Sequence, residues 1–214
     1  MAHPFSESER AAVYRVISER RDMRHFVPTP VDPATLDRLI EAAHHAPSVG
    51  YMQPWRILRI TDPALRETLH AAVENERMKT ADALGKRRDE FMRLKVEGMR
   101  QCAEILVVGL MDGRDSYVFG RRTMPEMDLA SVACAIQNMW LAARAEGLGL
   151  GWVSIFDPDE VRRILHMPAG AKPVAILCLG HVEQFYEAPM LEIEGWAERK
   201  PLSECVFENY WPDM

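Results

Sequence analysis

Three arginines and an aspartate stand together in the short run "ERRDMRHF". Planar guanidinium groups such as those of Arg20, Arg21 and Arg24 match a phosphate or a polarised carbonyl and can bind either bidentately. A solvated helix end would explain the same cations, because positive charge near a helix C-terminus stabilises it by about 0.3–1 kcal/mol. Asp22 is either a salt-bridge partner for these arginines or a carboxylate directed into a site.

A second candidate is the stretch "AAHHAPSVGYMQPW", residues 42–55, which joins an expected helix to the apolar run "WRILRI". Ser48 and Gln53 give this connection more hydrogen-bonding side chains than a simple turn needs, and Pro47 and Pro54 stiffen it. The stretch therefore predicts a loop whose polar side chains bind a ligand.

Glycines open a third candidate segment, "GLGLGWVSIF". They follow an expected helix and begin a strand, which is the reverse of the order in a dinucleotide-binding fingerprint. Gly147 is a natural helix stop. Gly149 and Gly151 predict a strand where missing side chains let a flat ligand approach the backbone.

The remaining polar residues suggest no further catalytic or metal-binding site. The sequence contains no Walker loop, zinc-ligand spacing or nucleophile elbow, so we expect no metal site. His44 and His45 are adjacent, so on a helix they point about 100° apart and cannot easily bind one metal. Gln137 and Asn138 lie in an apolar helix and need partners, either in a loop or across a subunit interface.

The composition excludes several classes of protein. The 214 residues are 48% hydrophobic, which suits one domain spanning 1–214. A net charge of −6 gives no general attraction to nucleic acid or to an anionic membrane. The four cysteines are widely spaced and suggest buried thiols rather than disulfides. With no apolar stretch behind a basic head in "MAHPFSESER", we expect no signal peptide and a cytoplasmic protein.

Caps and apolar runs predict alternating helices and strands. Ser6 with Glu9 forms a capping box, and three Asp-Pro pairs mark further helix starts. Helices are expected near 6–20, 33–45, 63–79, 85–100, 128–146 and 158–166, and strands at 55–60, 104–110, 150–155 and 173–179. The fold class is therefore α/β or α+β, with helices covering a mixed sheet.

Two segments predict a homodimer. The helix at 128–146 is apolar on nearly every face, and in so small a chain such a helix is more easily buried between two copies than alone. It is interrupted by polar residues and makes a poor membrane span. After residue 180 the chain has aromatic and proline patches with little periodicity. Residues 181–214 are therefore expected to form an extended C-terminal arm across a partner.

Taken together, these motifs resemble the flavin-binding nitroreductase superfamily. The runs "AAHHAPSVGYMQPW", "LKVEG", "PEMDLASVACAIQNMWLAARAEGLGLGWVSIFDP" and "CLGHV" are similar to its dimethylbenzimidazole synthase (BluB-type) branch, whose members are also labelled cob(II)yrinic acid a,c-diamide reductases. The resemblance runs from about residue 10 to residue 202. One departure is that only His25 separates Arg24 from Phe26, where the branch often has one residue more.

The resemblance implies an α+β nitroreductase-like homodimer with FMN at the subunit interface. Arg20, Arg21 and Arg24 would hold the phosphate and ribityl end of FMN, with Asp22 and Met23 beside them. Ser48 and Gln53 would bond its polar edges, and the strand of Gly151, Trp152 and Ser154 would lie along the ring. Lys95 and its helical neighbours would form part of a lid.

In this branch reduced FMN is the substrate, and molecular oxygen breaks it into 5,6-dimethylbenzimidazole, the lower ligand of vitamin B12, and erythrose 4-phosphate. By resemblance, Asp22 and Ser154 are the candidates for moving protons near the ring. The long polar stretch "ERMKTADALGKRRDEFMRLKVEGMRQ" could cover the flavin, although a surface helix pair would explain its charges equally well.

Two other functions remain open. The first is a conventional NAD(P)H-dependent FMN reductase acting on cob(II)yrinic acid a,c-diamide, quinones or nitro compounds. The second is a non-catalytic flavin-binding protein, which has no need of a placed acid such as Asp22. The sequence leaves open whether a separate flavin reductase supplies the electrons.

Overall fold

The computed structural model describes residues 4–212, which form three layers: one antiparallel sheet with helices on each of its two faces. The strand order is β1 (Trp55–Arg59), β2 (Glu104–Leu110), β4 (Lys172–Gly180) and β3 (Gly149–Val153). All three strand pairings are antiparallel, so the expected mixed sheet was wrong for these strands. A parallel pairing does occur outside them, as an isolated bridge between Asp22 and Leu150.

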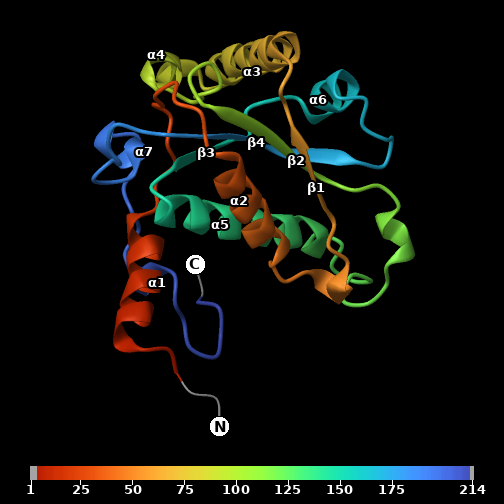
Figure 1. The fold of residues 1–214 in the computed structure, drawn as a ribbon, viewed down its shortest axis with the longest axis vertical. Coiled ribbons are helices and arrows are strands. Elements are labelled where there is room, and N and C mark those ends of the chain that lie inside the picture. Colours follow the sequence, from red (N-terminus) through yellow and green to blue (C-terminus); the bar gives the residue numbers. More distant parts are fainter. Residues whose placement is uncertain (1–3, 213–214) are drawn as a thin grey trace.

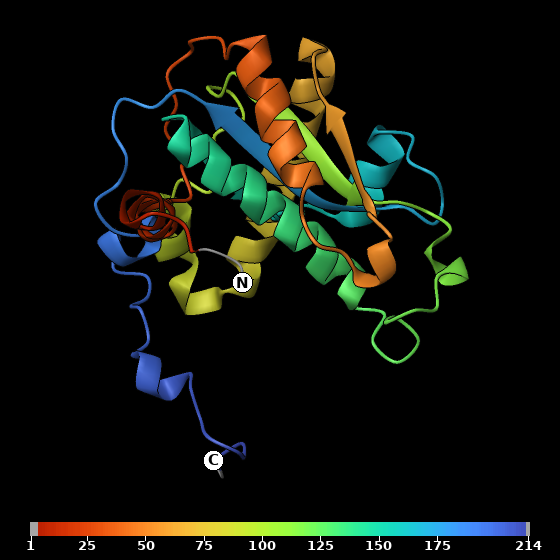
Figure 2. The same cartoon turned by 60° about the horizontal axis from the view of Figure 1, so that its bottom comes forward.

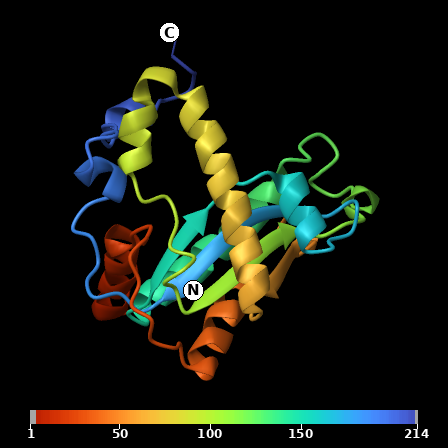
Figure 3. The same ribbon diagram turned by 90° about the horizontal axis from the view of Figure 1, so that it is seen from above.

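Each face of the sheet has its own core because side chains alternate along a strand. In β2, Leu106 and Val108 face α2 (Pro33–His44) and α5 (Met127–Ala145). Ile105 and Val107 face the other core, which includes Leu69 of α3 (Pro63–Ala83) and Val161 of α6 (Pro158–Ile164). Figure 1 shows α2 and α5 below the sheet and α3 and α6 above it, and Figure 3 looks down on α3 crossing the strands.

The caps expected from the sequence are present. Ser6 and Glu9 make a complete capping box at the start of α1 (Glu7–Glu19). The Asp32, Asp62 and Asp157 side chains each accept main-chain N–H groups at the start of a helix that begins with proline. Gly147 has a φ of 76°, in the left-handed region that glycine enters without strain, directly after α5.

The helix expected at 85–100 was largely wrong. A short 3-10 helix at Gly85–Arg87 leads into α4 (Arg88–Arg93), and Leu94 already has an extended backbone. The Arg77 guanidinium on α3 donates to the carbonyls of Met92 at 2.8 Å and Leu94 at 3.2 Å. A continued helix would use those carbonyls internally, so this side chain takes the place of the next turn.

The helix expected to be buried between two copies is α5, and within one chain it is not buried on every side. One face of α5 is buried against the sheet. The opposite face includes Leu129, 47% exposed, together with exposed Cys134 and Gln137. Neighbouring α1 buries none of its residues and exposes Val13 and Tyr14. Within residues 4–212, no helix has the length and apolar character that a bilayer crossing requires.

The C-terminal arm contacts its own chain before it leaves the body. After α7 (Met190–Ile193), the Trp196 ring packs beneath the Arg87 guanidinium at 3.5 Å and against Phe91. The described residues from 197 onward are all exposed, and Figure 2 shows this part extending away from the domain. Residues 213–214 of the expected arm lie outside the described residues.

All four cysteines are free, but only two are buried. The exposure of Cys134 and Cys205 corrects the expectation of four buried thiols.

Candidate functional site

The arginine-rich segment leaves α1 and runs beside β3. The Met23 N–H donates to the Leu150 carbonyl at 3.0 Å, and Asp22 forms the parallel bridge with Leu150. Trp140 of α5 anchors the same segment by donating its indole N–H to the Arg21 carbonyl at 3.0 Å. Met23 itself is fully buried in the core, so its side chain faces away from any solvent-accessible site.

Both carboxylate oxygens of Asp22 accept hydrogen bonds. One carboxylate oxygen accepts the Trp152 N–H at 2.9 Å, and the other accepts from Arg24 Nη2 at 2.6 Å. Arg24 Nη2 also donates to the Trp152 carbonyl at 2.8 Å, which closes a small network. The network fixes the carboxylate on the end of β3, as a positioned proton carrier requires.

Burial raises the pKa of Asp22, and the charge of Arg24 and the Trp152 hydrogen bond oppose the shift only in part. The side chain is 41% exposed, but it is recessed between the strand and the arm. Reduced contact with bulk water disfavours the charged carboxylate more than these partners favour it. The group is therefore easier to protonate than an ordinary aspartate.

The glycines of β3 make room for protein rather than for a ligand. A Cβ on Gly151 would lie 2.2 Å from the Met23 carbonyl oxygen and 3.0 Å from Arg24 Nη1. A Cβ on Gly149 would meet Val182 at 2.5 Å and the Met23 side chain at 3.1 Å. The expectation that these missing side chains admit a flat ligand was wrong, because the Arg20–Arg24 segment occupies the space.

A cavity of about 790 Å³ lies against this segment, and Arg20, Arg21 and Asp22 are in its wall. Arg21 already donates to the carbonyls of Ser18, Arg20 and Glu187. The Arg20 guanidinium lies over the Trp140 ring at 4.5 Å and donates no hydrogen bond to any described residue. Burial lowers the pKa of Arg20, although a guanidinium stays charged in proteins.

A smaller hollow of about 200 Å³ adjoins Asp22 on another side. Ser154, directly after β3, lines it with an exposed hydroxyl that makes no hydrogen bond to the described residues. Most of the rest of its wall is apolar and comes from α4, the coil after α4, the coil after β3 and the arm: Phe91, Leu94, Val96, Ile155, Met190, Leu191 and Trp196. Asp22 lines both cavities and therefore lies where they meet.

The Ser48–Gln53 loop is at the other end of α5. The Ser48 hydroxyl accepts the Gln53 N–H at 3.0 Å, and Ser131 of α5 accepts the Val49 N–H at 3.0 Å. A Cβ on Gly50 would lie 2.7 Å from the Phe119 carbonyl, so the 113–126 segment packs directly on this loop.

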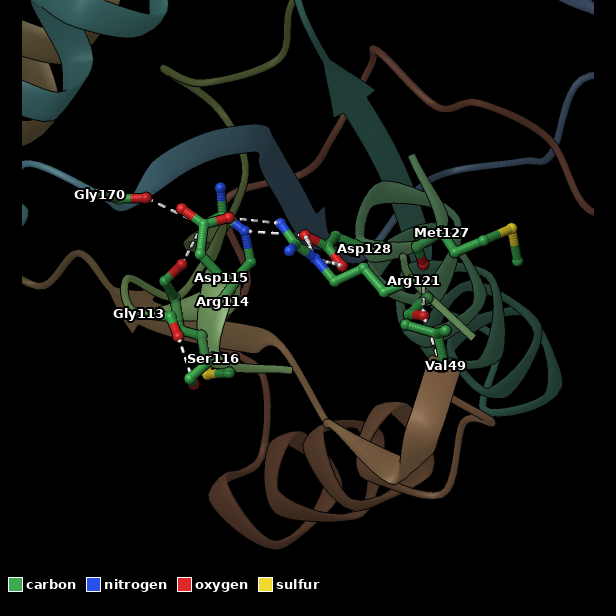
Figure 4. Close-up of polar contacts among 11 residues, drawn as sticks. Val49, Gly113, Arg114, Asp115, Ser116, Arg121, Met127, Asp128 and Gly170 are labelled. Atoms are coloured by element: carbon green, nitrogen blue, oxygen red, sulfur yellow. Dashed lines mark hydrogen bonds and ion pairs between the residues drawn. The ribbon is translucent and has the colours of Figure 1, made fainter. Parts of the chain in front are cut away.

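A buried carboxylate holds that neighbouring segment in place (Figure 4). Asp128, 4% exposed, accepts from Arg114 at 3.1 Å and from Arg121 at 2.9 Å. Arg121 also pairs with Asp115 at 3.1 Å. The network ties the start of α5 to the segment that supports the Ser48–Gln53 loop.

The two groups of expected residues therefore do not meet within one chain. Ser131 marks the loop end of α5 and Trp140 marks the arginine end, about 14 Å apart along the axis at 1.5 Å per residue. Asn138, which is half-buried, donates to the Ala42 carbonyl at 3.2 Å, whereas Gln137 lines the larger cavity. Lys95 is also apart: it lies in coil, not on a helix, and donates to Gln101 at 2.9 Å.

Comparisons with known proteins agree with this fold. The model of the nitroreductase family matches residues 17–181. The chain belongs to the nitroreductase family. It is 40% identical over 199 residues to the 5,6-dimethylbenzimidazole synthase of Rhodobacter capsulatus, covering 92% of this chain and 96% of that protein.

Two further comparisons agree with this result. A 5,6-dimethylbenzimidazole synthase of Rhodospirillum rubrum is 40% identical over 202 residues, covering 92% of this chain and 94% of that one. The crystal structure of an oxidised iodotyrosine deiodinase bound to FMN and 3-iodo-L-tyrosine superposes with a TM-score of 0.73 at 20% identity, covering 93% of this chain and all of that one (100%). That likeness shows a shared nitroreductase fold.

Sequence reasoning missed several residues around the candidate site, most of them from the arm. Tyr186 accepts the Arg24 N–H at 3.1 Å and bonds His25 at 2.7 Å. Glu187 and Arg199 line the larger cavity. The sequence does contain a signal for these residues, the cluster of aromatic, proline and charged residues after 180. That cluster indicated that the arm contacts a protein surface, but it did not indicate which residues the arm contacts.

Proposed function

We propose that this chain is a 5,6-dimethylbenzimidazole synthase, which fragments reduced FMN with molecular oxygen to form the lower ligand of vitamin B12. The two synthases that match nearly its whole length support this assignment. The observation that carries it is Asp22, held by Trp152 and Arg24 at the junction of two cavities with its pKa raised. A protein that only stored flavin would have no need of such a group.

The donors around the larger cavity fit FMN. Its volume of about 790 Å³ is within the range of small-molecule and cofactor sites. Arg20, whose guanidinium donates no hydrogen bond to the described residues, and Arg199 both line it, so they are the cations that would hold the phosphate. Arg21 would shape the wall, since its bonds go to carbonyls, and Arg24 would position Asp22.

When bound, reduced FMN supplies the electrons for oxygen and the ring that is cut. Asp22 would accept and return a proton from its place at the end of β3, and its raised pKa brings it closer to the working pH. The Ser154 hydroxyl would donate from the wall of the smaller hollow. The apolar wall around it, including Phe91 and Trp196, would exclude water from the reaction.

The proposal includes a homodimer whose sites each use two chains. The Ser48–Gln53 loop lies too far along α5 to meet its own Arg20, so the loop of a second copy would complete the site. The exposed face of α5 around Leu129, the exposed side chains of α1 and the arm beyond residue 196 offer the surface for that copy. Closed two-fold dimers are the commonest soluble homo-oligomers.

Purified protein mixed with chemically reduced FMN and then exposed to air tests the activity. We expect 5,6-dimethylbenzimidazole, identified by chromatography and mass spectrometry, only when protein and oxygen are both present. Quantitative return of intact FMN would contradict the proposal. An NAD(P)H-dependent reductase acting on a cobalt corrinoid would then be the better assignment. The proposal also includes a cytoplasmic location, which the four free cysteines support. The electrons would come from NAD(P)H or from a separate flavin reductase.

A further inference from the structure

A second polar cluster lies on the other side of the sheet from α5. His70 and Glu74 project from α3, and Glu97 comes from the coil that follows α4. One ligand-type atom from each residue lies within 4.8 Å of the other two. All three line a cavity of about 540 Å³ that shares no residue with the two cavities around Asp22.

The histidine is buried without a hydrogen bond. His70 is 6% exposed, and its Nε2 lies 3.8 Å from Glu97 Oε1, too far for a hydrogen bond. Neither ring nitrogen bonds any other described residue, and neither is among the side-chain nitrogens sealed from solvent without a partner, so the ring remains accessible from the cavity. The ring lines the cavity together with both carboxylates, so a shared partner would lie between the three residues.

The two carboxylates are placed to share that partner. Glu74 follows His70 by one helical turn, which puts both side chains on one face of α3. Glu97 Oε2 accepts the Met99 N–H at 2.5 Å, which orients the carboxylate and leaves Oε1 toward His70.

Nearby arginines do not neutralise the cluster fully. Arg100 pairs with Glu67 at 2.5 Å rather than with the cluster. Arg77 Nη1 reaches Glu74 at 3.4 Å, but its Nη2 is committed to the carbonyls of Met92 and Leu94. Neither arginine donates to Glu97, so the cluster keeps an excess of negative charge.

We propose that His70, Glu74 and Glu97 bind a divalent first-row cation, with Zn²⁺ as the best fit. One imidazole and two carboxylates are ligands that Zn²⁺ accepts, with a further position left for water. The cation would join α3 to the coil after α4, whose Leu94 and Val96 form part of the wall of the smaller hollow. The sequence predicted no metal site because it has no zinc-ligand spacing, and Glu97 is distant in sequence from His70 and Glu74.

Calorimetric titration of ZnCl₂ into tag-free, chelator-treated protein in reductant tests the proposal without flavin, so the result is independent of the proposed activity. We expect one saturable site per chain. Repeating the titration with MnCl₂ guards against binding by Cys134 and Cys205, because thiols favour softer ions than Mn²⁺.

Substitutions identify the ligands. Glu74→Gln and Glu97→Gln keep the side-chain shape, and each should weaken Zn²⁺ binding by at least about tenfold. Glu67→Gln is the matched control, since Glu67 lines the same cavity but lies outside the ligand set, and its affinity should match the wild type. Circular dichroism of each metal-free variant checks that it is folded.

Two results would overturn the site. One is a wild-type chain with no saturable Zn²⁺ binding. The other is a Glu67→Gln variant that loses as much affinity as Glu74→Gln and Glu97→Gln, which would indicate diffuse attraction to surface charge. If Glu97→Gln does not fold, the comparison of Glu74→Gln with Glu67→Gln decides the outcome alone.

Discussion

The Asp22 carboxylate accepts the main-chain N–H of Trp152 at 2.9 Å, and this bond joins the segment after α1 to the end of β3. Two distant parts of the sequence therefore hold one carboxylate, the group proposed to carry the proton. The bond depends on the close approach that Gly151 allows and on Arg24, which holds the second carboxylate oxygen. The proposed chemistry depends on this junction, and the following predictions test its parts.

Gly151→Ala should destabilise the fold. The added Cβ would lie 2.2 Å from the Met23 carbonyl oxygen, and backbone atoms cannot move aside as a flexible side chain can. We expect the free energy of unfolding to fall by about 1–3 kcal/mol, as measured by urea denaturation. Gly170→Ala is the control: its Cβ would meet only the Asp112 side chain at 3.1 Å and nearby loop backbone at 3.4 Å or more. Equal stability of the two variants would disprove the packing argument.

Asp22 should make stability fall as the pH rises. Because its pKa in the folded chain is raised above the ordinary 3.8, the folded state binds more protons than the unfolded state between those two values. The contribution is fully present below the ordinary pKa and is lost as the pH rises through the folded value. The free energy of unfolding of the wild type minus that of Asp22→Asn should therefore decrease with pH across this window. An increase would mean that the pKa is lowered instead.

Asp128→Asn should loosen the loop that supports Ser48. The substitution leaves Arg114 and Arg121 without their buried carboxylate, and we expect a loss of about 3–5 kcal/mol in the free energy of unfolding. Asp115→Asn is the control, because Asp115 pairs with the same Arg121 from a fully exposed side chain (100%), and its loss should be far smaller. Similar losses would show that burial of Asp128 is not what matters.

Hybrid dimers should regain activity lost by both parents. An Asp22→Asn chain and a Gln53→Ala chain would each damage every site in their own homodimer. If each site takes Asp22 from one chain and Gln53 from the other, a mixed dimer keeps one intact site. Random mixing of equal amounts should then restore about one quarter of the wild-type sites, measured as product formed. Native mass spectrometry confirms that hybrids form. Hybrids with no regained activity would place both residues in one chain's site.

Much of the fold could be predicted from sequence because its signals are local. Ser6 with Glu9 and the Asp-Pro pairs fix the helix starts, and continuous apolar runs fix β2 and β4. The stretch after α3 could not be predicted in the same way. There the polar pattern allows a helix, and Arg77, a residue of the preceding helix, ends it by taking its carbonyls.

The candidate site was predictable as a set of residue types but not as an arrangement. Asp22 and its arginines were recognisable from their charges, yet their division into a free Arg20, a carbonyl-bound Arg21 and a positioning Arg24 depends on contacts with the arm and β3. Gly151 was correctly selected for close approach, but the approaching group is the chain's own backbone. Such non-local contacts leave no periodic signal.

The most direct test follows the fate of reduced FMN in a single turnover. Wild-type, Asp22→Asn and Asp159→Asn proteins would be loaded with reduced FMN under anaerobic conditions and given a pulse of oxygen. Asp159 is an exposed aspartate paired with Arg162, so it controls for loss of a carboxylate elsewhere. We expect 5,6-dimethylbenzimidazole from the wild type and from Asp159→Asn, and a rate lower by about 10²-fold or more in Asp22→Asn with FMN still bound. Intact oxidised FMN from the wild type, or an unchanged rate in Asp22→Asn, would contradict it.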